Sequence, residues 1–238
     1  MKIAIVHGQS HCGTTCQMGR IFAEKLADKS DIEEFFLPRD LGGAYCVGCY
    51  RCIEDETKCH AWEKKSRILE ALEKADLWIF TTPNYCMSAS APMKAFLDLT
   101  FDMWMVHRPK AWAFRKRAVV FSASAGASCK GAVGVVAKSL RYWGVPEIRS
   151  FALPVHAMNW EGVDGKTKDK IAGKLDGLAR SVTRRRDPKT GCKTKILFFI
   201  MRGLHTKGWD SSPKEGEYWK ERGWLGKSRP WKDEDKQS

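Results

Sequence analysis

Short apolar runs alternate along the chain with amphipathic stretches, from the N-terminus to about residue 185. This alternation is typical of βαβ units around a parallel sheet. The run at 32–37 contains two Glu, which favours an edge position, whereas the run at 75–81 is almost wholly apolar, as in a strand buried on both faces. The predicted strands are residues 2–7, 32–37, 75–81, 117–121 and 148–155.

The stretches between these strands have the apolar spacing of helices. In the first of them, Met18, Phe22 and Leu26 recur every four residues, so that they share one helix face. The predicted helices are residues 14–27, 62–74, 90–101, 131–143 and 166–185.

The last part of the chain departs from this pattern. A basic, Pro- and Gly-containing break begins at Arg184, which divides the chain into a body of residues 1–186 and an extension of residues 187–238. Residues 184–238 hold 15 Lys or Arg and 8 Asp or Glu, and four of the ten Trp lie there. So aromatic a segment is expected to pack on the body or on a second subunit. Its apolar stretch, 195–202, favours a subunit interface over a membrane surface.

Composition narrows the class of protein. The 238 residues are 43% apolar, which suits one α/β domain with an appendage and excludes a disordered chain. No apolar run reaches the ~20 residues that span a bilayer, and no secretory signal pattern opens the chain. We therefore expect a cytoplasmic protein whose nine Cys are reduced or hold a metal. The net charge of +13 leaves nucleic acid, anionic lipid and anionic cofactors open, although a solvated surface is favoured.

The first predicted strand ends in a loop that suits phosphate. In open parallel sheets, ligands bind beyond the carboxyl ends of the strands. Here glycines and hydroxyls precede a helix N-terminus, whose free N–H groups and dipole favour an anion. The pattern is neither a Walker loop nor GxGxxG, and an ordinary capped turn is the alternative. The candidate residues are Gly8, Ser10, His11, Gly13, Thr14 and Thr15.

Two further loops leave the same edge of the sheet. The loop after 75–81 offers flat and polarisable side chains for a ring system, and Ser88 and Ser90 are candidates to cap the next helix. The loop after 117–121 consists of small residues that let the backbone approach a ligand. The candidates are Pro83, Asn84, Tyr85, Cys86, Met87 and Ser88 in the former, and Ser122, Ala123, Ser124, Ala125 and Gly126 in the latter.

Taken together, these loops resemble those of the NAD(P)H-dependent FMN reductases, a branch of the flavodoxin-like fold. The resemblance covers about residues 1–180 and rests on the Gly8/Ser10/Thr15 loop, the segment 83–98 and the small-residue loop 122–126. It implies a five-stranded parallel sheet of order 2-1-3-4-5 with helices on both faces. It also implies that the first loop holds the FMN phosphate and that the other two hold the ring. His11-Cys12 departs from the Pro-Arg pair of many members.

A run of cysteines is the sharpest local pattern. Cys46, Cys49, Cys52 and Cys59 follow the second strand with the spacing of a 4Fe–4S ligand set, and the pattern resembles that of iron–sulfur flavoproteins. Zinc and free or structural thiols are the alternatives. The other cysteines lack ligand spacing and are expected to be buried apolar fillers, with two of them near the cofactor. They are Cys12, Cys16, Cys86, Cys129 and Cys192, and those expected near the cofactor are Cys12 and Cys86.

The functional expectation is an FMN-dependent oxidoreductase that takes hydride from NAD(P)H and reduces a quinone, a flavin or a nitroaromatic. No catalytic side chain is expected, because the flavin carries the chemistry. The alternatives are an iron–sulfur electron carrier that links ferredoxin-like donors to an acceptor, a binding module that uses the basic extension, and a thiol sensor without flavin. A homodimer or homotetramer without nucleic acid is expected. His107, His156 and His205 are expected to be structural.

Overall fold

The computed structural model describes residues 1–184 and 188–232. Five parallel strands form one sheet in the order β2-β1-β3-β6-β7. The expected order 2-1-3-4-5 is therefore numbered differently, because a short hairpin, β4–β5, lies in the chain between the third and fourth strands of the sheet. The bounds are β1 Ile3–His7, β2 Ile32–Phe36, β3 Leu77–Thr81, β4 Asn84–Tyr85, β5 Ser88–Ala89, β6 Arg117–Ser124 and β7 Glu147–Pro154.

The position of each strand agrees with its hydrophobic pattern. Strand β3 lies at the centre of the sheet with every residue buried, and β2, with its two Glu, lies at an edge. Parallel register aligns Ile5 with Ile79, and Ile79 with Val119, so that one layer of aliphatic side chains crosses the sheet.

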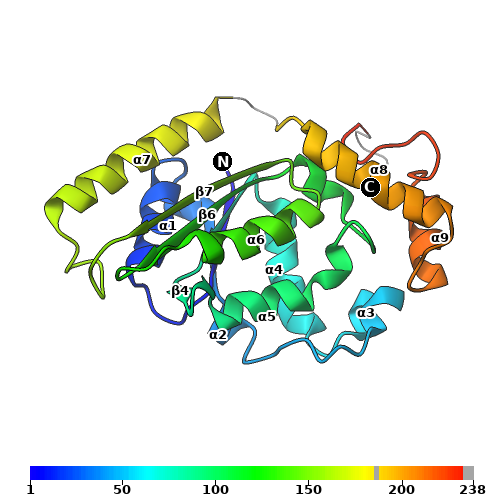
Figure 1. Ribbon diagram of the computed structural model, residues 1–238, viewed down its shortest axis with the longest axis horizontal. Coiled ribbons are helices and arrows are strands. Elements are labelled where there is room, and N and C mark those ends of the chain that lie inside the picture. Colours follow the sequence, from blue (N-terminus) through cyan, green and yellow to red (C-terminus); the bar gives the residue numbers. More distant parts are fainter. Residues whose placement is uncertain (185–187, 233–238) are drawn as a thin grey trace.

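Helices cover both faces of the sheet, as expected (Figure 1). Helices α1 and α7 bury Phe22 and Leu175 in one core, while α4, α5 and α6 bury Leu72, Phe96 and Leu140 in the other. These helices are α1 Thr14–Glu24, α4 Trp62–Lys74, α5 Ala91–Leu99, α6 Lys130–Tyr142 and α7 Gly165–Thr183. Shorter turns are α2 Leu37–Asp40, α3 Arg51–Glu54 and the 3-10 segments Lys29–Asp31, Glu56–Lys58, Phe101–Met103 and Ala111–Arg115.

The extension forms two helices, α8 Cys192–Thr206 and α9 Pro213–Glu221. Phe198, Trp219 and Trp224 pack against Met105 and Phe114 in a third core, which confirms that the extension packs on the body. Phe114 lies three residues before β6 begins, so the third core, and with it the extension, lies at the amino edge of the sheet. The loops where ligands bind are at the opposite edge (Figure 1).

The boundary predicted between residues 186 and 187 lies outside the described residues, as do positions 185–187 of the predicted break. Within residues 1–184 and 188–232, no helix is long and apolar enough to cross a bilayer.

Candidate functional site

Three loops meet at the carboxyl edge of the sheet and are joined to one another by hydrogen bonds. Ser90 Oγ donates to the carbonyl of Gly8 at 2.5 Å, which links the second loop to the first. The amide of Ala123 donates to Thr15 Oγ1 at 3.1 Å, and Asn84 Nδ2 donates to the carbonyl of Ser128 at 3.2 Å. The predicted convergence of the loops is therefore observed.

Ser90 corrects one expectation. It stands at the N-cap of α5, but its side chain makes no capping hydrogen bond to that helix. Its hydroxyl serves the first loop instead, and a Cβ atom at Gly8 would lie 2.5 Å from Ser90 Oγ. Only glycine therefore fits at this crossing of the two loops.

The first loop presents polar groups that the protein itself does not use. Helix α1 has no side-chain cap at Gly13 and no acidic residue in its first turn, so its first N–H groups face an open end. The side-chain atoms Thr14 Oγ1 and Gln9 Nε2 are buried without a hydrogen-bond partner. Buried orphan groups are costly unless a ligand or water satisfies them, and here they surround a helix N-terminus that favours an anion.

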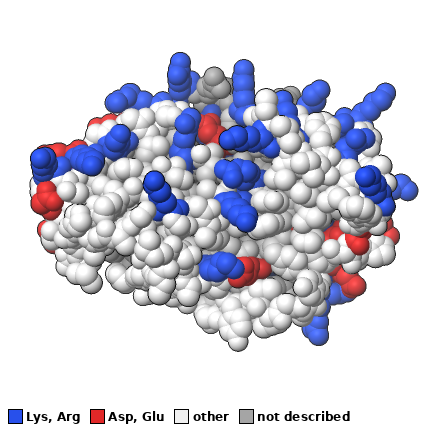
Figure 2. Space-filling model, viewed as in Figure 1, with Lys and Arg blue, Asp and Glu red and all other residues white. Residues whose placement is uncertain are grey.

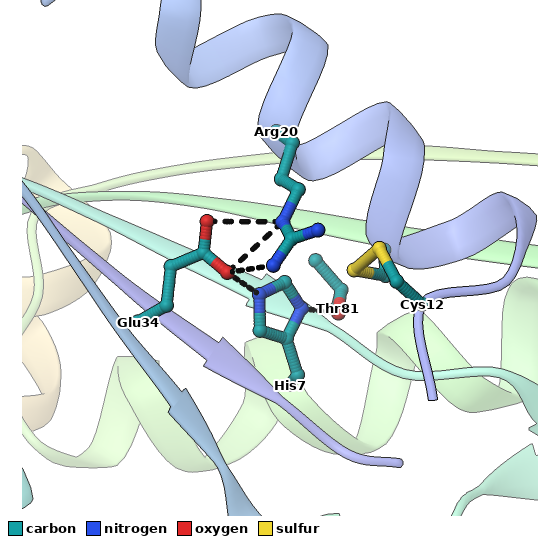
Figure 3. Close-up of a disulfide and its surroundings, with 6 residues drawn as sticks. His7, Cys12, Arg20, Glu34 and Thr81 are labelled. Atoms are coloured by element: carbon teal, nitrogen blue, oxygen red, sulfur yellow. Dashed lines mark hydrogen bonds and ion pairs between the residues drawn. A yellow bond between two sulfur atoms is a disulfide. The ribbon is translucent and has the colours of Figure 1, made fainter. Parts of the chain in front are cut away.

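A disulfide closes this loop. Cys12 and Cys16 are bonded, with Cα atoms 5.0 Å apart, and the ring they form encloses Gly13, Thr14 and Thr15 (Figure 3). Cys16 is buried as expected, but the expectation that both are reduced is wrong, because the loop before α1 brings Cys12 against Cys16 in the first turn of that helix. Cys129 is buried as expected, whereas Cys86 and Cys192 are exposed.

Beneath the loop lies a charged cluster that sequence reasoning missed. The fully buried His7 contacts Thr81 Oγ1 through Nδ1 at 2.8 Å and Glu34 through Nε2 at 3.3 Å, and Arg20 donates to the same carboxylate at 2.7 Å (Figure 3). Burial raises the pKa of Glu34, but hydrogen bonds from His7 and Arg20, together with their charge, outweigh it and lower that pKa to about 2. Since His7, Arg20 and Glu34 pair with one another, this cluster supports the loop.

The second loop is a hairpin whose turn is backbone-strained. Cys86 and Met87 have φ of 48° and 61°, a conformation that L-residues seldom adopt. Tyr85 and Met87 are each more than half exposed, so a flat apolar surface stands at the edge of the site. The carbonyl oxygen of Met87 lies 2.2 Å from where a Cβ atom of Gly131 would be, so α6 packs closely against the hairpin.

The third loop supplies small residues next to a buried hydroxyl. Ser122 Oγ is buried without a partner, and Asn84 Oδ1 of the second loop is likewise unpaired. Ser124 Oγ donates to the carbonyl of Ala127 and holds the turn, while Ala125 and Gly126 are exposed. His156 lies beside Gly126, because a Cβ atom there would be 4.0 Å from its Nδ1. His156 therefore lies at the rim of the third loop, next to Gly126.

The chemistry of these loops fits FMN. Of the eight buried side-chain atoms without a partner in the described chain, those of Thr14, Asn84 and Ser122 belong to predicted site residues, and that of Gln9 lies in the same first loop. Figure 2 shows that the surface over these loops, at the lower left, carries few charged side chains, as suits an uncharged ring.

The structure places the predicted loop residues as follows. Gln9 was not predicted, although its place between Gly8 and Ser10 was a usable signal. Ser10 and His11 are exposed at the mouth, Pro83 and Ala123 are buried, and Ser88 is half-buried.

The four-cysteine segment lies at the far end of α5 from the hairpin. Cys46, Cys49, Cys52 and Cys59 are free and line one narrow pocket. Burial and the nearby Asp102 carboxylate raise the pKa of Cys52 to about 12, so this thiol is protonated. In the described part of the chain no three His, Cys, Asp or Glu side chains stand close enough to hold a metal ion. The structure thus supports neither zinc nor a cluster here.

Two of the three histidines expected to be structural lie in the interface with the extension. His107 Nδ1 is 2.5 Å from Glu215 Oε1, and His205 Nδ1 contacts Asp210. Both lie at the amino edge of the sheet, away from the three loops.

Comparisons with known proteins agree with this geometry. The family model described as NADPH-dependent FMN reductase matches residues 1–158. A protein named iron-sulfur flavoprotein, from Archaeoglobus fulgidus, is 23% identical over 191 residues, covering 76% of this chain and 80% of the relative. An FMN-dependent NADH-azoreductase from Bacillus anthracis, solved in complex with FMN, is similar at a TM-score of 0.54 with 14% identity, over 75% of this chain and all of that one.

The flavoenzyme NAD(P)H:(acceptor) oxidoreductase FerB of Paracoccus denitrificans is similar at a TM-score of 0.51 with 18% identity, over 77% of this chain and 97% of that one. At such identities the solved structures establish the flavodoxin-like fold alone. The family model covers well over half of the chain, and the chain therefore belongs to the NADPH-dependent FMN reductase family.

Proposed function

We propose that the protein is an FMN-dependent oxidoreductase that takes reducing equivalents from NAD(P)H and passes them to a quinone, a flavin or a nitroaromatic. The observation that carries this proposal is the concentration of unpaired buried polar atoms in three loops that are bonded to one another at one sheet edge. A ligand with a phosphate and a polar ring edge would pair those atoms, and FMN has both.

Each loop has a role in this proposal. The N–H groups at the start of α1, with Thr14 Oγ1 and Gln9 Nε2, bind the phosphate. Tyr85 and Met87 cover the ring at the hairpin, and backbone N–H groups of residues 124–126 face its carbonyl edge. Bound FMN supplies the two-electron chemistry, so the protein contributes placement and charge.

The test is an anaerobic titration of the FMN-loaded protein with NADPH and with NADH. We expect the flavin absorbance to bleach with at least one nicotinamide and to return when a quinone is added. Protein that stays colourless after incubation with FMN would contradict the site. Bound FMN that neither nicotinamide bleaches would contradict the reaction.

A second candidate is an electron carrier that holds a 4Fe–4S cluster at the cysteine segment. The four thiols are not arranged to hold a metal ion in the structure described, so this candidate requires the segment to close around the cluster. It is favoured by one observation, that four free thiols line a single pocket together with the exposed Val47 and Tyr50, next to the exposed Tyr45. An exposed apolar patch of this kind suits a redox partner. The 9-residue helix α5, roughly 13 Å long, joins this pocket to the hairpin.

Anaerobic reconstitution with iron and sulfide tests this candidate. A brown chromophore with about four iron atoms per chain, lost in Cys49→Ser and kept in Cys192→Ser, would support it. Iron that stays at background in the parent chain would exclude it, without bearing on FMN.

A further inference from the structure

Helix α8 has an apolar side that the protein does not cover. Phe198, Met201 and His205 face the body and are buried. Ile196, Phe199 and Ile200 lie on the opposite side and are 59%, 46% and 54% exposed. At 3.6 residues per turn these three lie on one side of α8, where they form an exposed apolar stripe just over one turn long.

Cations surround this stripe. A shallow groove between α6 and α8 is lined by Lys138, Arg141 and Lys193 beside Ile196 and Ile200. Neither helix contains a single Asp or Glu, although each carries three Lys or Arg. Figure 2 shows Lys and Arg side chains along the border above α8 with no acidic side chain among them. None of the three groove cations forms an ion pair within residues 1–184 and 188–232.

The charge decides what fits this surface. A second copy of the same face would bring two positive rims together, because a twofold interface places the same patch on both sides. Nucleic acid would leave the apolar stripe in contact with phosphates. A bilayer with anionic lipid satisfies both features, since acyl chains take the stripe and headgroups take the cations. Trp209 lies just beyond α8 and is 68% exposed, with the Lys207 ammonium 5.6 Å from its ring centre. An exposed Trp beside a Lys is typical of a residue that anchors a helix at the membrane interface.

We propose that α8 docks the protein on the surface of a bilayer that contains anionic phospholipid, with the helix lying along the interface. The flavin-binding loops lie at the other end of the molecule (Figure 1). Docking therefore leaves them open to the solvent, and soluble donors and acceptors still reach the site. This inference does not depend on the reaction that the site performs.

The experiment is co-sedimentation of the full chain with phosphatidylcholine vesicles, with and without phosphatidylglycerol. We expect binding only with phosphatidylglycerol, and a loss of binding as salt rises. Phe199→Gln with Ile200→Gln should reduce the bound fraction at least tenfold, as should Lys138→Gln with Lys193→Gln. The matched controls are Met158→Gln, which alters an apolar side chain that is 90% exposed elsewhere, and Lys29→Gln with Lys58→Gln.

Each other outcome overturns the proposal. A parent chain that stays in the supernatant with both vesicle types excludes docking, and equal binding to both types excludes the role of charge. If Phe199→Gln with Ile200→Gln leaves vesicle binding intact but lowers the mass in analytical ultracentrifugation, the face is a subunit interface. Because the altered side chains are exposed, an unchanged thermal midpoint is expected for every variant.

Discussion

The two edges of the central sheet place their buried polar groups in different surroundings. At the carboxyl edge, Gln9, Thr14 and Ser122 each bury a polar atom that has no partner. At the amino edge, the extension is bonded into the body, since Tyr218 Oη donates to the carbonyl of Pro109 at 2.6 Å and Trp219 Nε1 donates to that of His107 at 2.8 Å.

The exceptions at the amino edge sharpen the difference. Four nitrogens of the described chain are unpaired there, but each lies against an aromatic ring: those of His205, Arg222, Trp104 and Trp143. The His205 ring lies 4.4 Å from that of Trp219, and the Arg222 guanidinium lies 3.5 Å from the ring centre of Tyr218. Trp104 stacks on Tyr142 at 4.3 Å, and Trp143 packs among Trp78, Phe80 and Phe96. Aromatic faces cover those atoms. The unpaired atoms of the amino edge thus lie among aromatic rings, whereas those of the carboxyl edge lie in loops around the open N-terminus of α1. Substitutions at the amino edge should therefore change stability alone, and substitutions at the carboxyl edge should change cofactor affinity.

The largest effect is expected from Trp219→Ala. Trp219 is fully buried and stacks on Phe198 at 5.0 Å, so its removal leaves a cavity and an unpaired carbonyl. The free energy of unfolding should fall by about 3–5 kcal/mol in urea denaturation. Trp209→Ala, at an exposed position, should change it by less than about 0.5 kcal/mol. A large loss of FMN affinity in Trp219→Ala would show that the two edges are not independent.

Gly8→Ala should act at the other edge. Its new Cβ would lie 2.5 Å from Ser90 Oγ and 3.0 Å from Met93 Cβ, which forces the first and second loops apart. Overpacking of this kind costs about 2 kcal/mol, so the FMN dissociation constant should rise about thirtyfold in a fluorescence titration. Gly134→Ala is the control, because nothing lies within 4 Å of that position. Equal affinities in the two variants would contradict the joined-loop geometry.

Opening the Cys12–Cys16 disulfide should have a smaller effect on the same loop. Chain entropy over so short a ring amounts to about 2 kcal/mol, and part of it is expected to appear in cofactor binding. Dithiothreitol should therefore raise the FMN dissociation constant about fivefold, and Cys12→Ser should show this higher value with or without reductant. Cys192→Ser, which removes an exposed free thiol, should respond to dithiothreitol as the parent does. If dithiothreitol leaves the FMN dissociation constant of the parent chain unchanged, the disulfide does not contribute to FMN binding.

Most of the sheet could be predicted because its strands are continuous apolar runs between turn residues. The helix predicted at 62–74 is observed at Trp62–Lys74. Helix α9 was missed because it is mostly polar, although Ser212 followed by Glu215 is a capping signal, and Glu215 indeed accepts from the amide of Ser211. Hairpin β4–β5 was missed because Cys86-Met87 lacks the glycine or asparagine that such turns normally use.

The site was predictable only as far as it follows from strand order. The carboxyl ends of adjacent parallel strands meet at one edge, so the three loops could be placed together. What joins them could not be foreseen, because Ser90 serves Gly8 instead of its own helix, and Cys12 pairs with Cys16 only once α1 has formed. The Glu34 cluster joins side chains from β1, β2 and α1, and these meet only when the two strands pair in the observed register. No local sequence pattern specifies that register.

That cluster gives the smallest expected effect. Because its pKa is lowered from 4.5 to about 2, Glu34 stabilises the folded state fully above about pH 4.5, and this contribution is lost as the pH falls toward 2. Allowing for solvent screening of a partly exposed pair, we expect about 1–2 kcal/mol, seen as a lower urea midpoint near pH 3 than near pH 6. Glu34→Gln should flatten this difference, whereas Glu33→Gln, exposed on the same strand, should keep it. FMN affinity near neutral pH should change little in Glu34→Gln, because the carboxylate supports the loop from beneath. A large loss of FMN affinity in Glu34→Gln would show that the carboxylate takes part in FMN binding itself.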